Sequence, residues 1–380
     1  LNNFTNNYKN LFKLAVKYFD SKSMTAIHDW WRYPIIAVMT CRGCIHNCII
    51  CGGSKYGMKY YCERSQPSFR NPELIVEDIK QISRFTTGPI FVIGDLNQPG
   101  YDYAEKVIAG LKHLKLKNEM VFEIFEPATE SFFEKIADAV PNFNFEFSPE
   151  SHDPKVRKKC GKFYSNEEIE LNIQWALERG CKKFDIFFMI GLPLQTPQSV
   201  LETVDYCRFL LDKFGTRVAP FISPLAPFLD PGSIAFENPD KFGYKIFYHT
   251  LEDYRTALLK PSWKYFLSYE TNWLNRDQIV DISYEAGKKL SKIKYDHGLI
   301  DRTEYEEILT RIELAKGLIQ RIDEICPNPD HIDCWDKLID LELNMDRDSI
   351  STINKKTEIK WPVLRNKFKI LNIIWAILFE

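Results

Sequence analysis

The sequence has 380 residues, of which 45% are hydrophobic and 27% are charged, a composition typical of a globular protein with a large apolar core. Its 50 basic and 52 acidic side chains leave a net charge of −2, so no general positive field attracts nucleic acid. There is no run of about 18 apolar residues and no signal-peptide pattern. We therefore expect no nucleic-acid partner, no transmembrane segment and a cytoplasmic location.

Six short β-rich runs alternate with segments of helical periodicity from residue 34 onward. The runs are Ile35–Thr40, Pro89–Gly94, Met120–Phe125, Phe143–Phe147, Phe184–Ile190 and Val218–Ile222. This alternation predicts parallel strands that are joined by helical crossovers. Because six units are too few for a closed eight-fold barrel, the sequence predicts an α/β fold built as a partial (β/α)6 TIM-like barrel.

Three helix starts can be read from capping signals in the crossover segments. Asn71 precedes a proline at the first helical position, and the same order recurs at Thr196. Ser165 is followed three residues later by Glu168, which is the spacing of a capping box. These signals predict that each of the three helices begins at the following residue.

The change in pattern along the chain predicts three parts. Residues 1–33 form an approach segment, residues 34–235 the partial barrel, and residues 236–380 a helical region rich in charged amphipathic segments. The last stretch, 361–380, is mostly apolar and is interpreted as a helix that packs on the barrel, with an interfacial membrane helix as the alternative.

The loop after the first predicted strand carries Cys44, Cys48 and Cys51 in a C-x3-C-x2-C spacing. Thiolates are the usual protein ligands of iron–sulfur clusters, and a tight loop can bring three of them to one cluster. Three ligands leave one iron of a [4Fe–4S] cluster open to a cofactor or substrate. Such a concentration of cysteines favours a metal site over a disulfide framework.

A second interpretation pairs Cys41 with Cys44 and Cys48 with Cys51 as two CxxC motifs. Zinc sites normally separate such pairs by a dozen or more residues, whereas only three residues intervene here. A four-cysteine electron-transfer cluster that includes Cys41 is a related possibility. Either version describes a non-catalytic module that depends on Cys41 as much as on Cys44.

Polar or conformationally special residues follow the other predicted strands. In parallel barrels the chemistry lies at the carboxyl ends of the strands, so these residues are expected to share one site. They include Asp95 after the second strand, Ser148 and Glu150 after the fourth, and Met189 and Gly191 at the end of the fifth. Arg157, further along from the fourth strand, is interpreted either as a carboxylate clamp or as a solvated helix residue.

Together these motifs resemble the radical S-adenosylmethionine (SAM) superfamily. The resemblance implies a [4Fe–4S] cluster on the three cysteines and reductive cleavage of SAM to a 5′-deoxyadenosyl radical. It also implies that Asp95 binds the SAM amino group, that Ser148 and Glu150 reach its ribose and carboxylate, and that Met189 and Gly191 line the adenine. The sequence departs from the family where Ile50 replaces an aromatic residue and Gly94-Asp95 replaces a Gly-Glu pair.

Over residues 30–300 the sequence more narrowly resembles proteins that join a cobalamin-binding domain to a radical SAM domain. That resemblance adds cobalamin as a cofactor and methylation of an unactivated carbon as the reaction. No Asp-x-His-x-x-Gly cobalamin signature occurs, and the chain starts at Leu1, so we expect a truncated or separately encoded cobalamin domain. The expected partners are a small-molecule or lipid-like substrate and a reductant such as ferredoxin or flavodoxin.

Overall fold

The computed structural model describes residues 8–18, 30, 32–224, 228–326, 358, 360–361 and 367–379. Its centre is one six-stranded sheet in which every neighbouring pair is parallel. The strands lie in chain order: β1 (Ile36–Met39), β4 (Ile90–Ile93), β5 (Met120–Ile124), β6 (Phe143–Glu150), β7 (Phe184–Ile190) and β8 (Val218–Pro224). All six predicted strands are present, the fourth and sixth extending further than expected.

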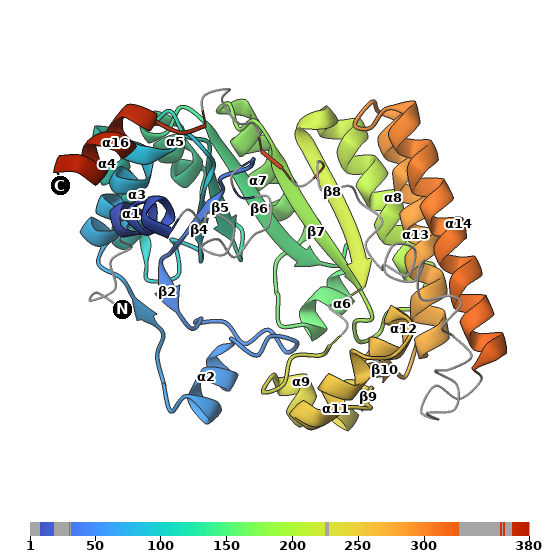
Figure 1. The fold of residues 1–380 in the computed structure, drawn as a ribbon. Helices are drawn as coiled ribbons and strands as arrows, with labels where there is room; N and C mark the ends of the chain where they lie inside the picture. The colour runs from blue at the N-terminus through green and yellow to red at the C-terminus, as the bar shows by residue number, and fades with distance from the viewer. Residues whose placement is uncertain are drawn as a thin grey trace.

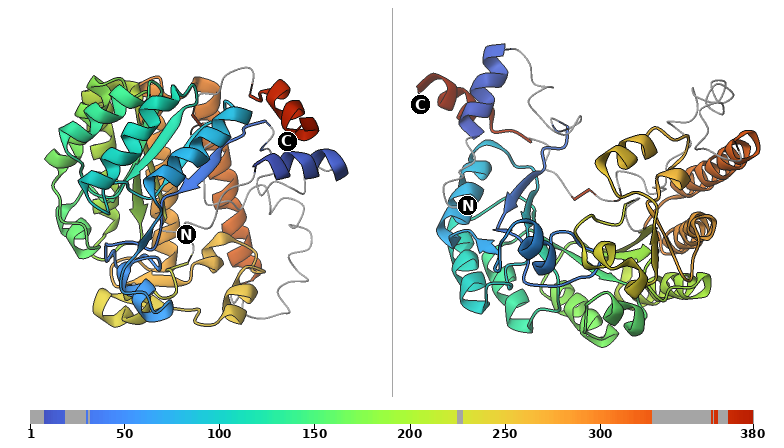
Figure 2. Two further views of the ribbon diagram at one scale, coloured as in Figure 1. Left: turned by 90° about the vertical axis from the view of Figure 1, so that its left-hand side faces the viewer. Right: turned by 90° about the horizontal axis from the view of Figure 1, so that it is seen from below.

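Helical crossovers join the strands and cover the outside of the sheet (Figure 1). They are α3 (Pro72–Phe85), α4 (Tyr101–Leu114), α5 (Glu130–Ala139), α6 (Pro154–Lys159), α7 (Asn166–Glu178) and α8 (Pro197–Phe214). Seen from below, the strands line the inside of an open arc and the helices form its outer wall (Figure 2, right). Strands β1 and β8 are the two ends of the sheet and do not pair, so the predicted partial (β/α)6 barrel is confirmed.

The three predicted helix starts agree with the structure in position, and two of them have side-chain capping hydrogen bonds. Ser165 and Thr196 both form capping boxes, in which the cap side chain and the third helical residue satisfy each other's backbone donors. Pro72 is the first residue of α3 as expected, but the Asn71 side chain makes no capping hydrogen bond to the helix. Proline at the first helical position has no N–H that needs an acceptor, so α3 begins with one unsatisfied donor fewer.

The hydrophobic core lies between the outer face of the sheet and these helices. Phe145 of β6 is fully buried at its centre, with the rings of Phe122, Phe133 and Phe184 within about 6 Å of it. The alternate residues of each strand point to the inside of the arc instead, as the twofold periodicity of a strand requires.

The described residues beyond the barrel are mostly helical, as predicted. It contains the short helices α9 (Ile234–Glu237), α10 (Pro239–Phe242), α11 (Leu251–Ala257) and α12 (Trp263–Phe266), the antiparallel pair β9 (Tyr244–Ile246) and β10 (Tyr269–Thr271), and the long helices α13 (Arg276–Asp296) and α14 (Arg302–Ile325). Helix α13 packs between α8 and α14 beside strand β8, at the end of the sheet (Figure 1).

The apolar carboxyl-terminal stretch forms α16 (Ile370–Phe379), next to α1 (Tyr8–Tyr18). Its Ala376 packs against Phe85 of α3, as expected for a helix that docks on the barrel. Leu371, Trp375 and Phe379 remain exposed, so only one face of the helix is used in this contact. Among the described residues, no helix has the length and apolar character needed to cross a membrane.

We predict that Phe145→Ala lowers the free energy of unfolding by about 3–5 kcal/mol, because it leaves a cavity among close-packed rings. Phe163, which is 74% exposed, provides the matched control, and its change to alanine should alter stability by less than about 0.5 kcal/mol. Urea denaturation measures both values. Equal losses in the two variants would contradict the described core.

Candidate functional site

The four cysteines of the candidate site lie in the loop that leaves strand β1. The loop starts with β2 (Cys41–Arg42), which pairs antiparallel with β3 (Ser68–Phe69), and ends at α2 (Lys55–Tyr61). It lies at the carboxyl ends of the parallel strands, the lower end of the barrel in Figure 1. This is where the chemistry of parallel barrels is found.

The three predicted cluster ligands are free, partly exposed thiols. Burial raises the pKa of the Cys44 thiol to about 12 and that of Cys48 to about 11, and it also raises the pKa of Cys51. After burial, the neighbouring cysteines also contribute to raising the pKa of Cys44 and Cys48. Without a bound metal these thiols keep their protons, so they need a cation to become ligands.

Backbone hydrogen bonds fix the cysteine loop to distant parts of the chain. The Ile49 N–H donates to the Cys160 carbonyl at 3.1 Å, and the Ile49 carbonyl accepts from the Ala235 N–H at 2.9 Å. The Ile45 N–H donates to Oε1 of Gln98 in the loop after β4, at 3.1 Å. These bonds hold the loop from three sides, so the positions of the cysteines are set by the whole barrel end.

Glycines allow this close packing at two of the contacts. Gly161 has φ of +95°, and a Cβ at this position would lie 2.9 Å from the Asn47 carbonyl oxygen of the cysteine loop. Gly57 of α2 has even less space, since a Cβ there would lie 2.2 Å from the Gly52 carbonyl oxygen. Any larger residue at either position would push the cysteine loop away.

Asp95 is buried after strand β4, where it acts as an anchor for its own loop. Its Oδ1 accepts from the Asn97 N–H at 2.8 Å, and its Oδ2 accepts from the Phe125 N–H at 2.9 Å. Burial raises the pKa of this carboxyl in spite of these bonds. The side chain lies near His46 of the cysteine loop, but its oxygens already have protein partners.

Ser148 and Glu150 lie where strand β6 is irregular, with a shift of register between Phe147 and Glu150. Glu150 has a positive φ of +68°, which is rare for a residue with a side chain. Its Oε1 lies 2.6 Å from Nζ of Lys162, which also donates to the Ser148 carbonyl. Its Oε2 is buried and has no hydrogen-bond partner.

Arg157 is fully buried, so its interpretation as a solvated helix residue is wrong. Its Nε donates to the Tyr164 carbonyl at 2.9 Å, and its Nη1 donates to the Ser151 carbonyl at 2.8 Å and to Oδ1 of Asn166 at 2.9 Å. Its Nη2 is buried without a hydrogen-bond partner. The guanidinium therefore joins the end of β6 to the start of α7 and retains one unused donor.

Met189 and Gly191 lie at the end of β7 in a turn that Gln195 organises. Gln195 accepts from the Gly191 and Leu192 N–H groups at 2.9 and 3.0 Å, and its Nε2 donates to the Met189 carbonyl at 2.8 Å. Gly191 has φ of +93°, and a Cβ there would lie 2.5 Å from Oη of Tyr269. The turn is thus held by a side chain from within it and packed under the carboxyl-terminal region.

The structure connects Cys48 and Glu150 through one turn, because Gly161 packs against Cys48 and Lys162 pairs with Glu150. The sequence reasoning missed Lys162. The charge of Glu150 raises the pKa of both Cys48 and Cys51, whereas the charge of Lys162 lowers both. Lys162 follows the tight Gly161 turn but carries no local sequence signal, because its partner lies on another element. Gln195 was missed for a different reason, since a buried glutamine inside a turn resembles an ordinary polar loop residue.

The cysteines do not form the compact shell of a single-ion site. A tetrahedral Zn²⁺ with Zn–S bonds of about 2.3 Å needs its sulfurs within about 4 Å of one another. Throughout the described part of the chain, no three His, Cys, Asp or Glu side chains are grouped to hold one metal ion. A [4Fe–4S] cluster instead takes each thiolate on a different iron, so it accepts ligands that stand further apart.

A row of three carboxylates crosses the inside of the barrel beneath this site. Glu123, Glu146 and Asp185 are Cα partners on the adjacent strands β5, β6 and β7. Glu123 accepts from the Gly94 N–H at 2.7 Å, and Asp185 lies 2.9 Å from Nζ of Lys183. Burial and the two neighbouring carboxylates raise the pKa of Glu146 to about 8.

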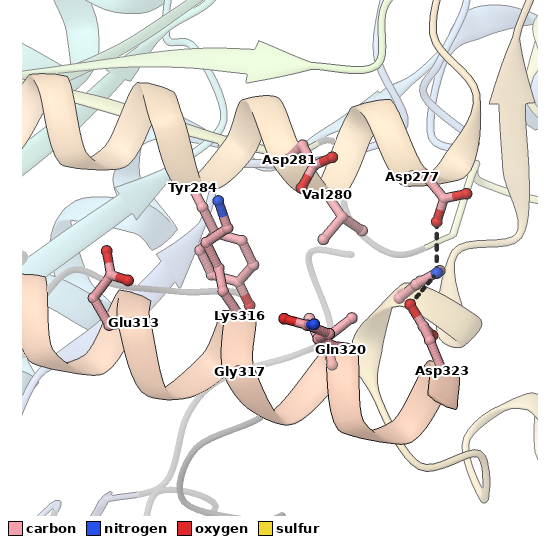
Figure 3. A pocket seen from close by; sticks show the side chains of 11 residues that line it. Asp277, Val280, Asp281, Tyr284, Glu313, Lys316, Gly317, Gln320 and Asp323 are labelled. Atoms are coloured by element: carbon pink, nitrogen blue, oxygen red, sulfur yellow. Dashed lines mark hydrogen bonds and ion pairs between the residues drawn. The ribbon is translucent and has the colours of Figure 1, made fainter. Parts of the chain in front are cut away.

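A pocket of about 460 Å³ lies between α13 and α14 (Figure 3). Lys264 crosses it, with Nζ 2.5 Å from Asp277 and 2.8 Å from Asp323. None of the residues predicted from the sequence lines this pocket. It is therefore separate from the candidate site.

Residues 38–207 match the family model of the radical SAM superfamily. The match begins within β1 and ends within α8, and it includes the three cysteines, Glu150 and Lys162. This part of the chain is therefore a radical SAM domain. No curated protein matches the sequence significantly.

Among solved structures, the chain is similar to the radical SAM methyltransferase TsrM from Kitasatospora setae, solved with tryptophan substrate and a SAM analogue bound. The sequence identity is 16% and the TM-score is 0.44, and the match covers 57% of this chain and 42% of that one. It is also similar to the cobalamin-dependent SAM radical enzyme OxsB, at 14% identity and a TM-score of 0.42 over 90% of this chain and 53% of that one. The chain thus spans about half the length of these proteins. Similarities this weak say nothing about its substrate or cofactors.

We predict that Glu146→Gln stabilises the protein increasingly as the pH rises from about 5 to about 8. In this range the folded state still holds a proton on Glu146 that the unfolded state has released, so wild-type stability falls as the pH rises. The difference in unfolding free energy should grow by up to about 1.4 kcal/mol per pH unit. Urea denaturation across this range, with exposed Glu73→Gln as the control, measures it; a constant difference would contradict the burial of a protonated Glu146.

Proposed function

We propose that this protein is a radical SAM enzyme whose Cys44, Cys48 and Cys51 hold a [4Fe–4S] cluster with one iron open to SAM. The observation that carries the proposal is the convergence of these free thiols with a buried carboxylate oxygen that has no hydrogen-bond partner, Oε2 of Glu150. A buried oxygen without a donor is costly unless a ligand supplies one. The ribose hydroxyls or the amino group of SAM are donors of the required kind.

When it is bound, the reduced cluster supplies the electron that breaks the sulfonium C5′–S bond of SAM, giving methionine and a 5′-deoxyadenosyl radical. The residues of this chain bind and orient. Glu150 accepts a hydrogen bond from SAM through Oε2. Nε and Nη1 of Arg157 already donate to the protein, so Arg157 would bind the SAM carboxylate through Nη2 alone and not as a two-nitrogen clamp.

The other proposed SAM contacts rest on the family resemblance and on their place at the strand ends. Met189 and Gly191 would line the adenine, and Ser148 would contribute beside Glu150. Asp95 would bind the amino group of SAM. Both of its carboxylate oxygens already accept backbone N–H groups, so this contact would use a remaining lone pair.

The finer proposal is cobalamin-dependent methylation or another modification of an unactivated carbon, with a small or lipid-like substrate and a ferredoxin or flavodoxin as reductant. Its support is the resemblance of residues 30–300 to the cobalamin-binding radical SAM proteins. We likewise propose the division into an approach segment at 1–33, a barrel at 34–235 and a helical region at 236–380.

We predict that the protein, reconstituted anaerobically with iron and sulfide and given SAM and dithionite, forms 5′-deoxyadenosine. Cys48→Ala should abolish the product, since the cluster would lose one of its three ligands. Chromatography of the nucleoside, with the iron and sulfide content of each sample, provides the measurement.

Two controls separate this proposal from a non-catalytic module. Exposed Cys62→Ala should leave product formation unchanged. Cys41→Ala should retain the cluster and the product, whereas a zinc or four-cysteine electron-transfer site would lose its metal. A well-formed cluster that cleaves no SAM, and that depends on Cys41 as much as on Cys44, would overturn the proposal.

A further inference from the structure

Lys162 is an unusual residue because its charged side chain is buried at the edge of the cysteine loop. It is only 7% exposed, whereas the next residue, Phe163, is 74% exposed. Burial of an ammonium group is unfavourable unless nearby groups compensate its charge. An apolar side chain at 162 and an outward lysine at 163 would satisfy packing better, so packing alone does not account for this order.

The contacts of Lys162 show what the buried charge does. Its Nζ lies 2.6 Å from Oε1 of Glu150 and donates to the Ser148 carbonyl. Oε2 of Glu150 is buried and has no hydrogen-bond partner. The ammonium thus holds the carboxylate by one oxygen and leaves the other without a hydrogen bond.

The turn that carries Lys162 is fixed directly to the cysteine loop. The Cys160 carbonyl accepts from the Ile49 N–H at 3.1 Å, and Gly161 packs against the Asn47 carbonyl and Cα of Cys48. Lys162 and Glu150 therefore keep a set position relative to Cys48.

We propose that Lys162 is a positioning residue with two effects at this site: it orients Glu150 so that one oxygen faces SAM, and its positive charge stabilises the reduced form of the cluster bound at Cys48. The inference rests on the proposed function and adds to it the control of ligand binding and of the reduction potential by one ion pair. Reduction adds a negative charge, which an adjacent cation stabilises and an adjacent anion destabilises.

The test compares Lys162→Met, Glu150→Gln and the double variant with the wild type. Lys158→Met is the matched control, because Lys158 belongs to the neighbouring helix α6 and is exposed. After reconstitution, the measurements are iron and sulfide content, the midpoint potential from a redox titration followed by electron paramagnetic resonance, and the dissociation constant of SAM for the oxidised protein.

Lys162→Met should shift the midpoint potential to more negative values, and Glu150→Gln should shift it to more positive values. Both should weaken SAM binding by about tenfold or more, as expected for the loss of one charge-assisted hydrogen bond. The double variant, which buries no unpaired charge, should return the potential toward the wild-type value while SAM binding stays weak. The double variant also provides the decisive comparison if Lys162→Met alone does not fold.

Potentials that shift in the same direction in the two single variants, or a double variant with wild-type SAM affinity, would overturn the inference. So would a Lys162→Met protein that matches Lys158→Met in both potential and affinity. If the wild type assembles a cluster and cleaves SAM while these variants behave like it, only this inference fails. If the wild type assembles no cluster at all, the proposed function fails first.

Discussion

Parallel pairing of all six strands is the constraint on which the candidate site depends, because it brings the carboxyl end of every strand to one edge. The sheet itself stays open between β1 and β8. At the site end, however, loops close the gap that the strands leave: the Gly52 N–H donates to Oδ2 of Asp230 at 3.0 Å, and the Ala235 N–H bonds to Ile49. The first and last strands are thus joined through the cysteine loop and not through a ladder.

The features that the sequence reasoning found are those that local patterns determine. Strand periodicity located all six strands, and the capping boxes at Ser165 and Thr196 marked helix starts because their bonds span only three residues. The cysteine spacing identified the loop for the same reason, since its chemistry lies within eight residues of sequence. The open barrel followed from the number of strands.

The features that it missed depend on contacts between distant elements. Lys162 acquires its meaning from Glu150 on another strand, and no pattern around position 162 indicates that its side chain turns inward. Arg157 was left between two interpretations because burial of a helix residue depends on what packs over it. For Asp95 the sequence suggested a ligand, and the structure shows that backbone donors from two loops already occupy its carboxylate.

Three acidic side chains lie next to one another on adjacent strands inside the barrel. The row of Glu123, Glu146 and Asp185 places like charges one strand spacing apart, about 4.8 Å, where they destabilise one another. Lys183 balances Asp185, and a backbone N–H balances Glu123. Glu146, between them, reduces the repulsion by keeping its proton, so the barrel interior below the cysteine loop carries less charge than its sequence suggests.

The left-handed backbone of Glu150 shows that folding and binding make different demands at this position. A residue with a side chain costs of order 1–3 kcal/mol in such a conformation, and glycine would avoid most of that cost. Glycine would also remove the carboxylate that pairs with Lys162. A glutamate at position 150 therefore keeps the backbone in a strained conformation at the end of β6. The rest of the barrel must be stable enough to tolerate this cost in free energy.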